Sequence, residues 1–187
     1  MINFILERVE LEPNDMLDTS KVFGAPTFPK DFMSRNGLND SYYFAQLNLD
    51  ELKEYDTPLP KEGMLYFFLR PTKYSFKPVV IYSNEELYEV MDDVNEVFEE
   101  LDFKDGLYMK FCPQGESGYL LDELDQEVPE LNNADQYIVL LKVDPLDVLA
   151  SDFPIFNNPD DEIYFMIKSK DLEECNFKKV KLVFHGS

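Results

Sequence analysis

Residues 59–69, Leu-Pro-Lys-Glu-Gly-Met-Leu-Tyr-Phe-Phe-Leu, join a turn to a strongly apolar strand and decide the expected fold. Proline and glycine at the start of this stretch predict the turn. The following residues, 64–69, are aromatic and aliphatic types that favour a strand. A near-copy, Ile-Tyr-Phe-Met-Ile, occurs at residues 163–167. The two stretches predict buried strands at equivalent places in a chain that repeats itself.

Two shorter similarities extend this repeat on either side. Residues 47–50 resemble residues 141–144, and residues 79–82 resemble residues 180–183, so the three offsets are 94, 98 and 101. Three strands in the same order with slowly drifting offsets are typical of a duplicated β unit with small loop insertions. Each unit alone would leave an apolar sheet face uncovered, so we expect the two to pack together as one domain.

The segment between the two units has the pattern of an amphipathic helix. Apolar residues recur at helical spacing from Leu87 to Leu101. Ser83 and Glu86 have the spacing of a capping box at its start. This pattern predicts one helix between the β-rich parts of the chain.

Together these patterns predict an α+β fold. We expect a β-rich single domain of two related sheet-containing halves, joined by an acidic amphipathic helix. The expected boundaries are 1–83 for the first half, 84–130 for the helix and its connector, and 131–187 for the second half.

The charge is strongly negative, because 38 acidic residues face 17 basic ones and the net charge is −21. Phosphate backbones and anionic membranes would repel such a chain, which argues against nucleic acid and membrane partners. Residues 84–130 hold 16 acidic and two basic residues, a net of −14. A solvated face that only confers solubility is one interpretation. Because so few basic residues are interspersed among these acidic ones, a second interpretation is favoured, in which the segment forms a surface that binds a basic protein. The expected partner-binding residues are Glu89, Asp92, Asp93, Glu96, Glu99 and Glu100.

The sequence offers little for catalysis. The single histidine, His185, lies near the chain end, and Cys112 and Cys175 are distant from it and from each other. These residues make neither a zinc ligand set nor a nucleophile with its base. Asn and Asp cluster at 157–162, but without the order of an EF-hand loop. No glycine-rich phosphate loop occurs. We therefore assign no catalytic residue, metal or cofactor, and the sequence favours a non-enzymatic role.

The same motifs resemble those of the YwqG-like family, a bacterial group of largely uncharacterised proteins. The resemblance rests on Phe23-Gly-Ala-Pro26 and on residues 44–49, 59–68, 139–144, 163–172 and 177–180. It departs from the family at Leu120, where a proline is expected. The resemblance implies an α+β fold with a β-rich core, and it brings no established catalytic residues.

Two functions follow from these observations as hypotheses. The first is a cytoplasmic protein-binding module of immunity or antitoxin type, whose acidic helix docks on a basic protein. The alternative is a small-molecule or sugar-binding module with an aromatic pocket between the halves, formed by Gln46, Tyr66, Phe68 and Tyr164. Two cysteines are too few for a disulfide scaffold, and no secretory leader or membrane span is visible, which favours the cytoplasm.

Overall fold

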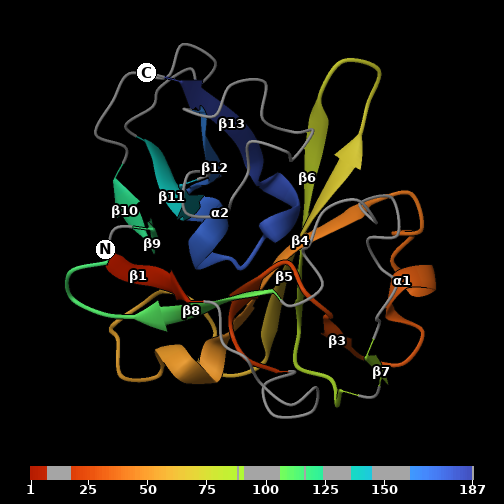
Figure 1. Cartoon of the computed structure of the whole chain (residues 1–187), viewed down its shortest axis with the longest axis horizontal. Helices are drawn as coiled ribbons and strands as arrows, with labels where there is room; N and C mark the ends of the chain where they lie inside the picture. Colours follow the sequence, from red (N-terminus) through yellow and green to blue (C-terminus); the bar gives the residue numbers. More distant parts are fainter. Residues whose placement is uncertain are drawn as a thin grey trace.

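Antiparallel strands dominate the computed structural model, which describes residues 1–7, 18–87, 89–90, 106–115, 117–123, 136–144 and 161–186 (Figure 1). The strands are β1 (Ile2–Glu7), β2 (Lys21–Val22), β3 (Thr27–Phe28), β4 (Tyr42–Asn48), β5 (Met64–Pro71), β6 (Phe76–Ser83), β7 (Glu89–Val90), β8 (Leu107–Phe111), β9 (Gly118–Leu120), β10 (Asp122–Glu123), β11 (Tyr137–Val143), β12 (Asp161–Lys168) and β13 (Lys181–Gly186). The helical elements are α1 (Phe32–Arg35), η1 (Leu49–Leu52), α2 (Ser169–Glu173) and η7 (Phe177–Lys179). None of these helices is long and apolar enough to cross a membrane.

Eleven strands form one antiparallel sheet in the order β13-β12-β11-β9-β1-β8-β2-β4-β5-β6, with β10 paired to β11. Strands β3 and β7 form a separate pair. The end strands of the order, β13 and β6, lie against each other, so the sheet is nearly closed into a barrel (Figure 1). Closure of this kind protects strand edges that would otherwise be exposed.

The predicted α+β class with a long acidic helix between two halves is therefore wrong. Within the range predicted as helix, Glu89–Val90 form strand β7 and pair with Thr27–Phe28. Residues 91–105 of that range lie outside the described residues. The Ser83 hydroxyl accepts a hydrogen bond from the Glu85 backbone N–H at 3.2 Å, as an N-cap would, but here it forms a turn at the end of β6. Pairing with a distant strand outweighs the local helical pattern.

Two three-stranded meanders within the sheet, β4-β5-β6 and β11-β12-β13, have the same construction. In the first strand of each, the pairing skips one residue, which is Phe44 in β4 and Leu140 in β11. Gln46 pairs with Tyr66 as Lys142 pairs with Tyr164, so the offset of the first strands is 142 − 46 = 96. The sequence matches had given 94 there. The pairing register therefore corrects the expected match of residues 47–50 with residues 141–144 by two residues.

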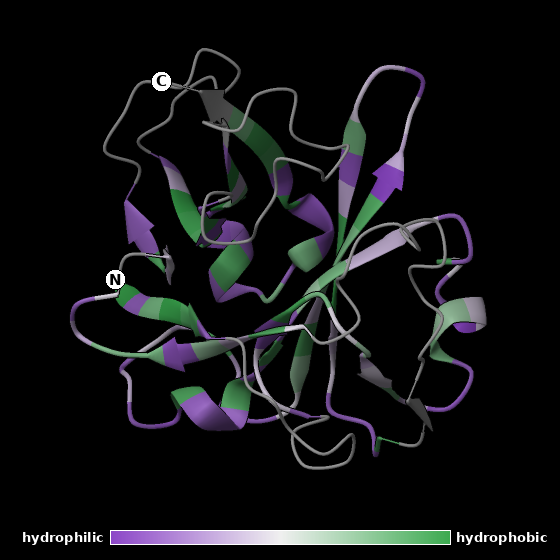
Figure 2. Cartoon of the chain, viewed as in Figure 1, coloured by the Kyte–Doolittle hydropathy of each residue, from purple (hydrophilic) through white to green (hydrophobic). Residues whose placement is uncertain are grey.

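The apolar core lies inside the closed sheet, where side chains of both meanders meet. The ring of Phe165 on β12 lies 5.4 Å from that of Phe44 and 5.0 Å from that of Phe67. Residues 64–69 of β5 and 163–167 of β12 are all buried, and Figure 2 shows hydrophobic residues along the strands and hydrophilic ones in many of the connecting loops. The outer face of β4 and β5 holds a second cluster under β3 and α1, and the outer face of β11 and β12 holds a third.

Candidate functional site

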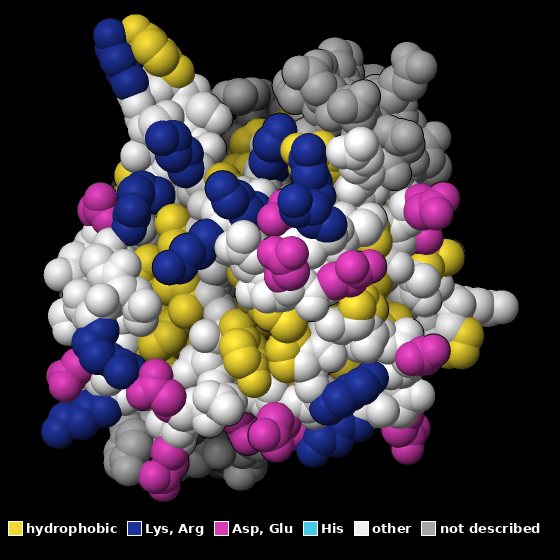
Figure 3. Space-filling model, turned by 180° about the vertical axis from the view of Figure 1, so that it is seen from behind, with side chains coloured by type: hydrophobic (Ala, Val, Ile, Leu, Met, Phe, Trp, Pro, Cys, Tyr) yellow, Lys and Arg dark blue, Asp and Glu magenta, His cyan; other side chains and the backbone are white. Residues whose placement is uncertain are grey.

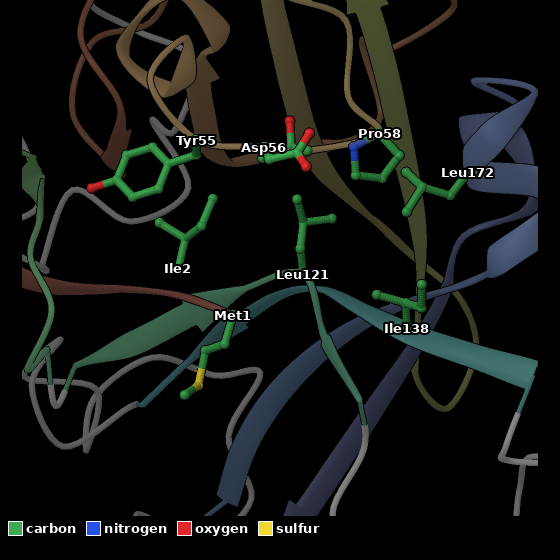
Figure 4. Close-up of a pocket in the computed structure, with 9 residues that line it drawn as sticks. Met1, Ile2, Tyr55, Asp56, Pro58, Leu121, Ile138 and Leu172 are labelled. Carbon is green, nitrogen blue, oxygen red and sulfur yellow. The ribbon is translucent and has the colours of Figure 1, made fainter.

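A cavity of about 340 Å³ lies where the first strand, the loop after η1, the β9–β10 turn, β11 and α2 meet (Figure 4). Its apolar walls come from Ile2, Pro58, Leu121, Ile138 and Leu172, and Met1, Tyr55, Asp56 and Thr57 complete the lining. Five separate parts of the sequence therefore build one site. No single stretch of the chain carries a pattern from which it could be recognised.

The floor of the cavity is set by the turn at Leu121. This residue has a φ of 54°, in the left-handed region, and its N–H donates to the carbonyl of Val139 at 2.8 Å. Strands β9 and β10 both pair antiparallel with β11, so they run in the same direction, and the irregularity between them places the Leu121 side chain in the cavity beside Ile2 and Ile138 (Figure 4). A leucine in this conformation is strained, so the surrounding strands hold it there.

The opposite wall is the loop of residues 55–58. The ammonium group of Lys61 donates hydrogen bonds to the carbonyls of Tyr55 at 3.2 Å and Thr57 at 3.4 Å. The Tyr55 ring packs at 6.5 Å from the ring of Phe111 on β8. In Figure 4 the Asp56 carboxylate lies between Tyr55 and Pro58, across from Leu121. Lys61 thus fixes the loop that faces the apolar floor.

The lining determines what this cavity can do. Its lining is mixed: aliphatic side chains lie beside polar groups that include one carboxylate, one phenol and one threonine hydroxyl. Such a combination is typical of small-molecule sites, where apolar area gives affinity and a few polar groups give orientation. The nine residues include no cysteine, histidine or lysine.

Three of the four residues expected to form an aromatic pocket lie together on the outer face of the first meander. Gln46, Tyr66 and Phe68 are each 0% exposed. The phenol of Tyr43 donates to the Gln46 side-chain oxygen at 3.2 Å, and that of Tyr66 donates to the Thr27 carbonyl at 2.7 Å. Burial raises the pKa of both tyrosines. These contacts are typical of a packed interior.

The fourth residue, Tyr164, lies in the separate cluster on the second meander. None of the four lines the cavity at the first strand. Ligand binding at Gln46, Tyr66, Phe68 and Tyr164 stays a prediction.

Charged groups that the sequence did not single out gather around Lys142 on β11. Its ammonium group lies 2.6 Å from the Glu162 carboxylate and 4.0 Å from that of Asp144. The Tyr119 ring centroid is 5.8 Å away, and the Tyr164 phenol donates to Glu162. In the first meander the position of Lys142 is held by Gln46, a neutral residue. Only the pairing register reveals this difference.

A second buried lysine, Lys21, lies on β2 between Tyr108 of β8 and Gln46 of β4. Desolvation lowers the pKa of its ammonium group to about 8, although Asp18 opposes this shift. Nearby, the Glu51 carboxylate accepts a hydrogen bond from the Ser20 N–H at 3.2 Å, and burial raises the pKa of Glu51. Lys21 sits in an ordinary-looking strand, so the sequence gives no signal for its burial.

Most of the expected partner-binding residues, Asp92, Asp93, Glu96, Glu99 and Glu100, lie outside the described residues. Glu89 belongs to β7. Asp50 and Asp144, matched by the predicted repeat, are not equivalent in the register: Asp50 lies in η1 and pairs with Lys53 at 2.6 Å, and Asp144 directly follows β11. Within the described ranges, no three His, Cys, Asp or Glu residues are grouped as metal ligands would be.

Comparison with known proteins identifies a family for this chain but no activity. No curated protein matches the chain. A family match covers residues 20–132, more than half of the chain, and extends from the residue before β2 past β10. The chain therefore belongs to the family of the domain of unknown function DUF1963.

Proposed function

We propose that this protein binds a small, largely apolar molecule in the cavity beside the first strand. The observation that carries the proposal is the space of about 340 Å³, lined by aliphatic and polar groups together, that is left where the two meanders meet β1. The mouths of barrels and the junctions between packed units are common places for ligand sites. The volume is also within the usual range for such sites, roughly 300–1,000 Å³.

The lining residues suggest how a ligand would be held. Ile2, Leu121 and Ile138 offer a continuous apolar floor, and each methylene buried there would contribute about 0.8 kcal/mol. Asp56 and Tyr55 face this floor from the Lys61-fixed loop and would orient a polar group of the ligand. The ligand site proposed here is thus the cavity beside β1, which is distinct from the aromatic pocket expected from the sequence.

The test is a thermal-shift screen of small apolar and amphipathic compounds, followed by calorimetric titration of any hit. Ile138→Phe should fill the cavity and weaken binding by more than about tenfold, which is about 1.4 kcal/mol. Ile81→Phe, a matched change at a half-buried residue of β6, should leave affinity unchanged. A screen without hits, or hits that bind Ile138→Phe as tightly as the native chain, would contradict the proposal.

Two finer assignments go with this proposal. Within the DUF1963 family we place the chain among YwqG-like proteins, on the strength of the motifs at residues 23–26, 44–49 and 59–68. We also place it in the cytoplasm, because Cys112 and Cys175 are both free thiols, as a reducing compartment would leave them.

A second candidate function is the binding of a basic protein by the acidic surface. The described residues include 20 acidic and 15 basic ones, a net of −5 out of −21. The negative charge is thus concentrated in the remaining stretches, of which residues 91–105 carry seven acidic residues and one lysine. Charge gathered in this way favours fast, selective association with a basic surface.

This candidate is tested by reversing Asp92, Asp93 and Glu96 to lysine. Any complex formed through the acidic surface should weaken with the reversal and with added salt. An immunity-type partner would be a basic toxin, and binding would be followed by titration of the purified pair. A complex that tolerates both the reversal and high salt would exclude the acidic surface as the contact.

A further inference from the structure

The cavity beside β1 holds a carboxylate that is available to a ligand. Among the nine residues that line it, Asp56 alone has a charged side chain. No ion pair within the described part of the chain involves Asp56. Lys61 lies close by, but its ammonium group donates to the carbonyls of Tyr55 and Thr57. The Asp56 carboxylate can therefore accept hydrogen bonds from a molecule in the cavity.

The sequence on either side of the lining residues is also acidic. The residues directly next to them include no lysine, arginine or histidine, and four are acidic, namely Glu54, Asp122, Asp171 and Glu173. The α-amino group of Met1 belongs to the lining, but it forms no ion pair with a described carboxylate. Met1 also lies on the other side of Leu121 from Asp56 (Figure 4). The space beside Asp56 therefore favours a cation over an anion.

Local charge decides this preference, because the described surface as a whole is mixed. Figure 3 shows Lys and Arg side chains beside Asp and Glu side chains on one face of the molecule. Charges that lie further apart than about 10 Å are largely screened at about 0.1 M salt. A bound cation would thus respond mainly to the carboxylate next to it.

The exposure of the lining changes across the cavity. Asp56 and Pro58 are exposed, whereas Ile2 and Leu172 are buried. Figure 4 shows the Asp56 carboxylate across from Leu121. A ligand that matches this arrangement has a polar end near solvent and an apolar body directed toward Ile2 and Leu172.

The Asp56 carboxylate restricts the chemistry of the polar end. An ionised carboxylate only accepts hydrogen bonds, so the ligand must donate them. Hydrogen bonds between charged partners are stronger than neutral ones, which favours an ammonium group over a hydroxyl. A carboxylate or phosphate on the ligand would be repelled. The ring of Tyr55, next in the chain to Asp56, is a further group that attracts cations.

We infer that the cavity binds an amphipathic primary amine. Its ammonium group pairs with Asp56, and its hydrocarbon body packs on Ile2, Leu121 and Ile138. The inference rests on the proposed function and names the class of ligand. Because Asp56 is exposed, the ion pair is partly solvated and contributes only modestly to affinity. The hydrocarbon body supplies most of the affinity, and the charge selects the head group.

The experiment compares n-hexylamine, 1-hexanol and hexanoate, which share an apolar tail and differ in the head group. In calorimetric titration, hexylamine should bind at least about fivefold more tightly than hexanol, a difference of about 1 kcal/mol. Hexanoate should bind most weakly. Asp56→Asn should remove the advantage of the amine and change the affinity for hexanol by less than about twofold. Glu54→Gln, the same loss of charge outside the lining, should preserve most of the advantage.

Two controls exclude binding to carboxylates elsewhere on this acidic chain. Methylamine has the charge without the tail and should not bind measurably at the same concentrations. Ile138→Phe should weaken the binding of hexylamine by more than about tenfold. Far-UV circular dichroism should confirm that each variant is folded.

The outcomes separate this inference from the proposed function. Hexylamine affinity that is unchanged by Asp56→Asn or by Ile138→Phe overturns the inference. Equal binding of hexylamine and hexanol, both weakened by Ile138→Phe, also overturns it and leaves the cavity as a ligand site. If none of the three tailed compounds binds, the inference fails, and the wider screen described above decides the proposed function separately.

Discussion

Lys142 carries a charge at a position where the first meander of the same protein has an amide. Its register equivalent is Gln46, and Glu162, two residues before Tyr164, corresponds to Met64, two residues before Tyr66. The Lys142 side chain is only 11% exposed, and that of Glu162 is 27% exposed. A buried ion pair gains little over neutral residues, whereas removal of one partner leaves a charge without compensation.

Glu162→Met should therefore destabilise the protein more than the double change Lys142→Gln with Glu162→Met. The single variant should lose about 1–3 kcal/mol of unfolding free energy, less than a fully buried pair, because Glu162 is partly solvated and the Asp144 carboxylate remains 4.0 Å from the Lys142 ammonium group. The double variant copies Gln46 and Met64 and should recover most of that loss. Urea denaturation measures both values, and a double variant less stable than the single one would contradict this account.

Lys21 makes the stability depend on pH in the alkaline range. Its folded-state pKa is about 8, against an ordinary 10.5, because burial disfavours the ammonium form. Between these values the unfolded chain binds more protons than the folded one, so the unfolding free energy contributed by Lys21 rises with pH. Below about pH 8 the cost of burying the charge is fully present.

Lys21→Met should be more stable than the native chain at pH 7, and its advantage should shrink toward pH 9.5. Above that range the buried phenols of Tyr43 and Tyr66 oppose the trend, since their pKa values are raised and the unfolded chain loses those protons first. Chemical denaturation between about pH 7 and 9.5 follows the difference. Parallel pH profiles for the two proteins would show that Lys21 is not the source.

At the scale of elements, β3 and α1 act as a cover over the outer face of the first meander. Phe28 of β3 is completely buried, and its ring lies 4.9 Å from that of Phe32, 5.1 Å from that of Tyr66 and 5.8 Å from that of Phe68. Short elements such as these have little intrinsic stability, so aromatic packing is what keeps them in place.

Phe28→Ala should lower the unfolding free energy by about 3–5 kcal/mol, because it removes a ring from the centre of this cluster. Tyr74→Ala, at the 85% exposed tip of the β5–β6 hairpin, is the control and should change it by less than about 0.5 kcal/mol. Both are measured by denaturant unfolding. Equal effects of the two changes would mean that β3 does not cover the sheet as described.

The strands expected at residues 64–69, 79–82 and 163–167 are confirmed, because each lies inside β5, β6 or β12. The expected helix after Ser83 is wrong where it can be compared, since β7 occupies Glu89–Val90. Runs of apolar and aromatic residues specify buried strands locally. The spacing of apolar residues after Leu87 resembles a helical face, but it could not foresee that β3 offers backbone partners from a distant part of the chain.

At the scale of the whole molecule, the interior of the sheet joins the two meanders into one core. Phe165 of the second meander packs directly on Phe44 and Phe67 of the first. The outer cluster around Val183 and Met166 has its buried residues on the second meander, with Tyr119 of β9 packed against them. Loss of a core contact should therefore destabilise both meanders, whereas loss of a contact in the outer cluster should destabilise mainly the second meander.

Phe165→Ala should accelerate amide hydrogen exchange in β5 as well as in β12, because the shared core loses a ring that both meanders contact. Val183→Ala, on the outer face, should accelerate exchange mainly in β12 and β13. Hydrogen exchange resolved along the sequence distinguishes the two patterns. If Phe165→Ala left β5 as protected as in the native chain, the meanders would not share a cooperative core.

By itself, the sequence determined which residues form the buried strands, that two parts of the chain are alike, and where the negative charge is concentrated. These features depend on neighbouring residues or on composition, so they can be read along the chain. The tertiary structure alone decided the closed sheet, the cavity and the charged cluster at Lys142. Each of these brings together residues from distant segments, as when Ile2 meets Leu121 and Leu172 in the cavity. Strand pairing and register determine which distant residues come into contact. A shift in register changes every one of these contacts without changing the pattern of apolar and polar residues along the chain.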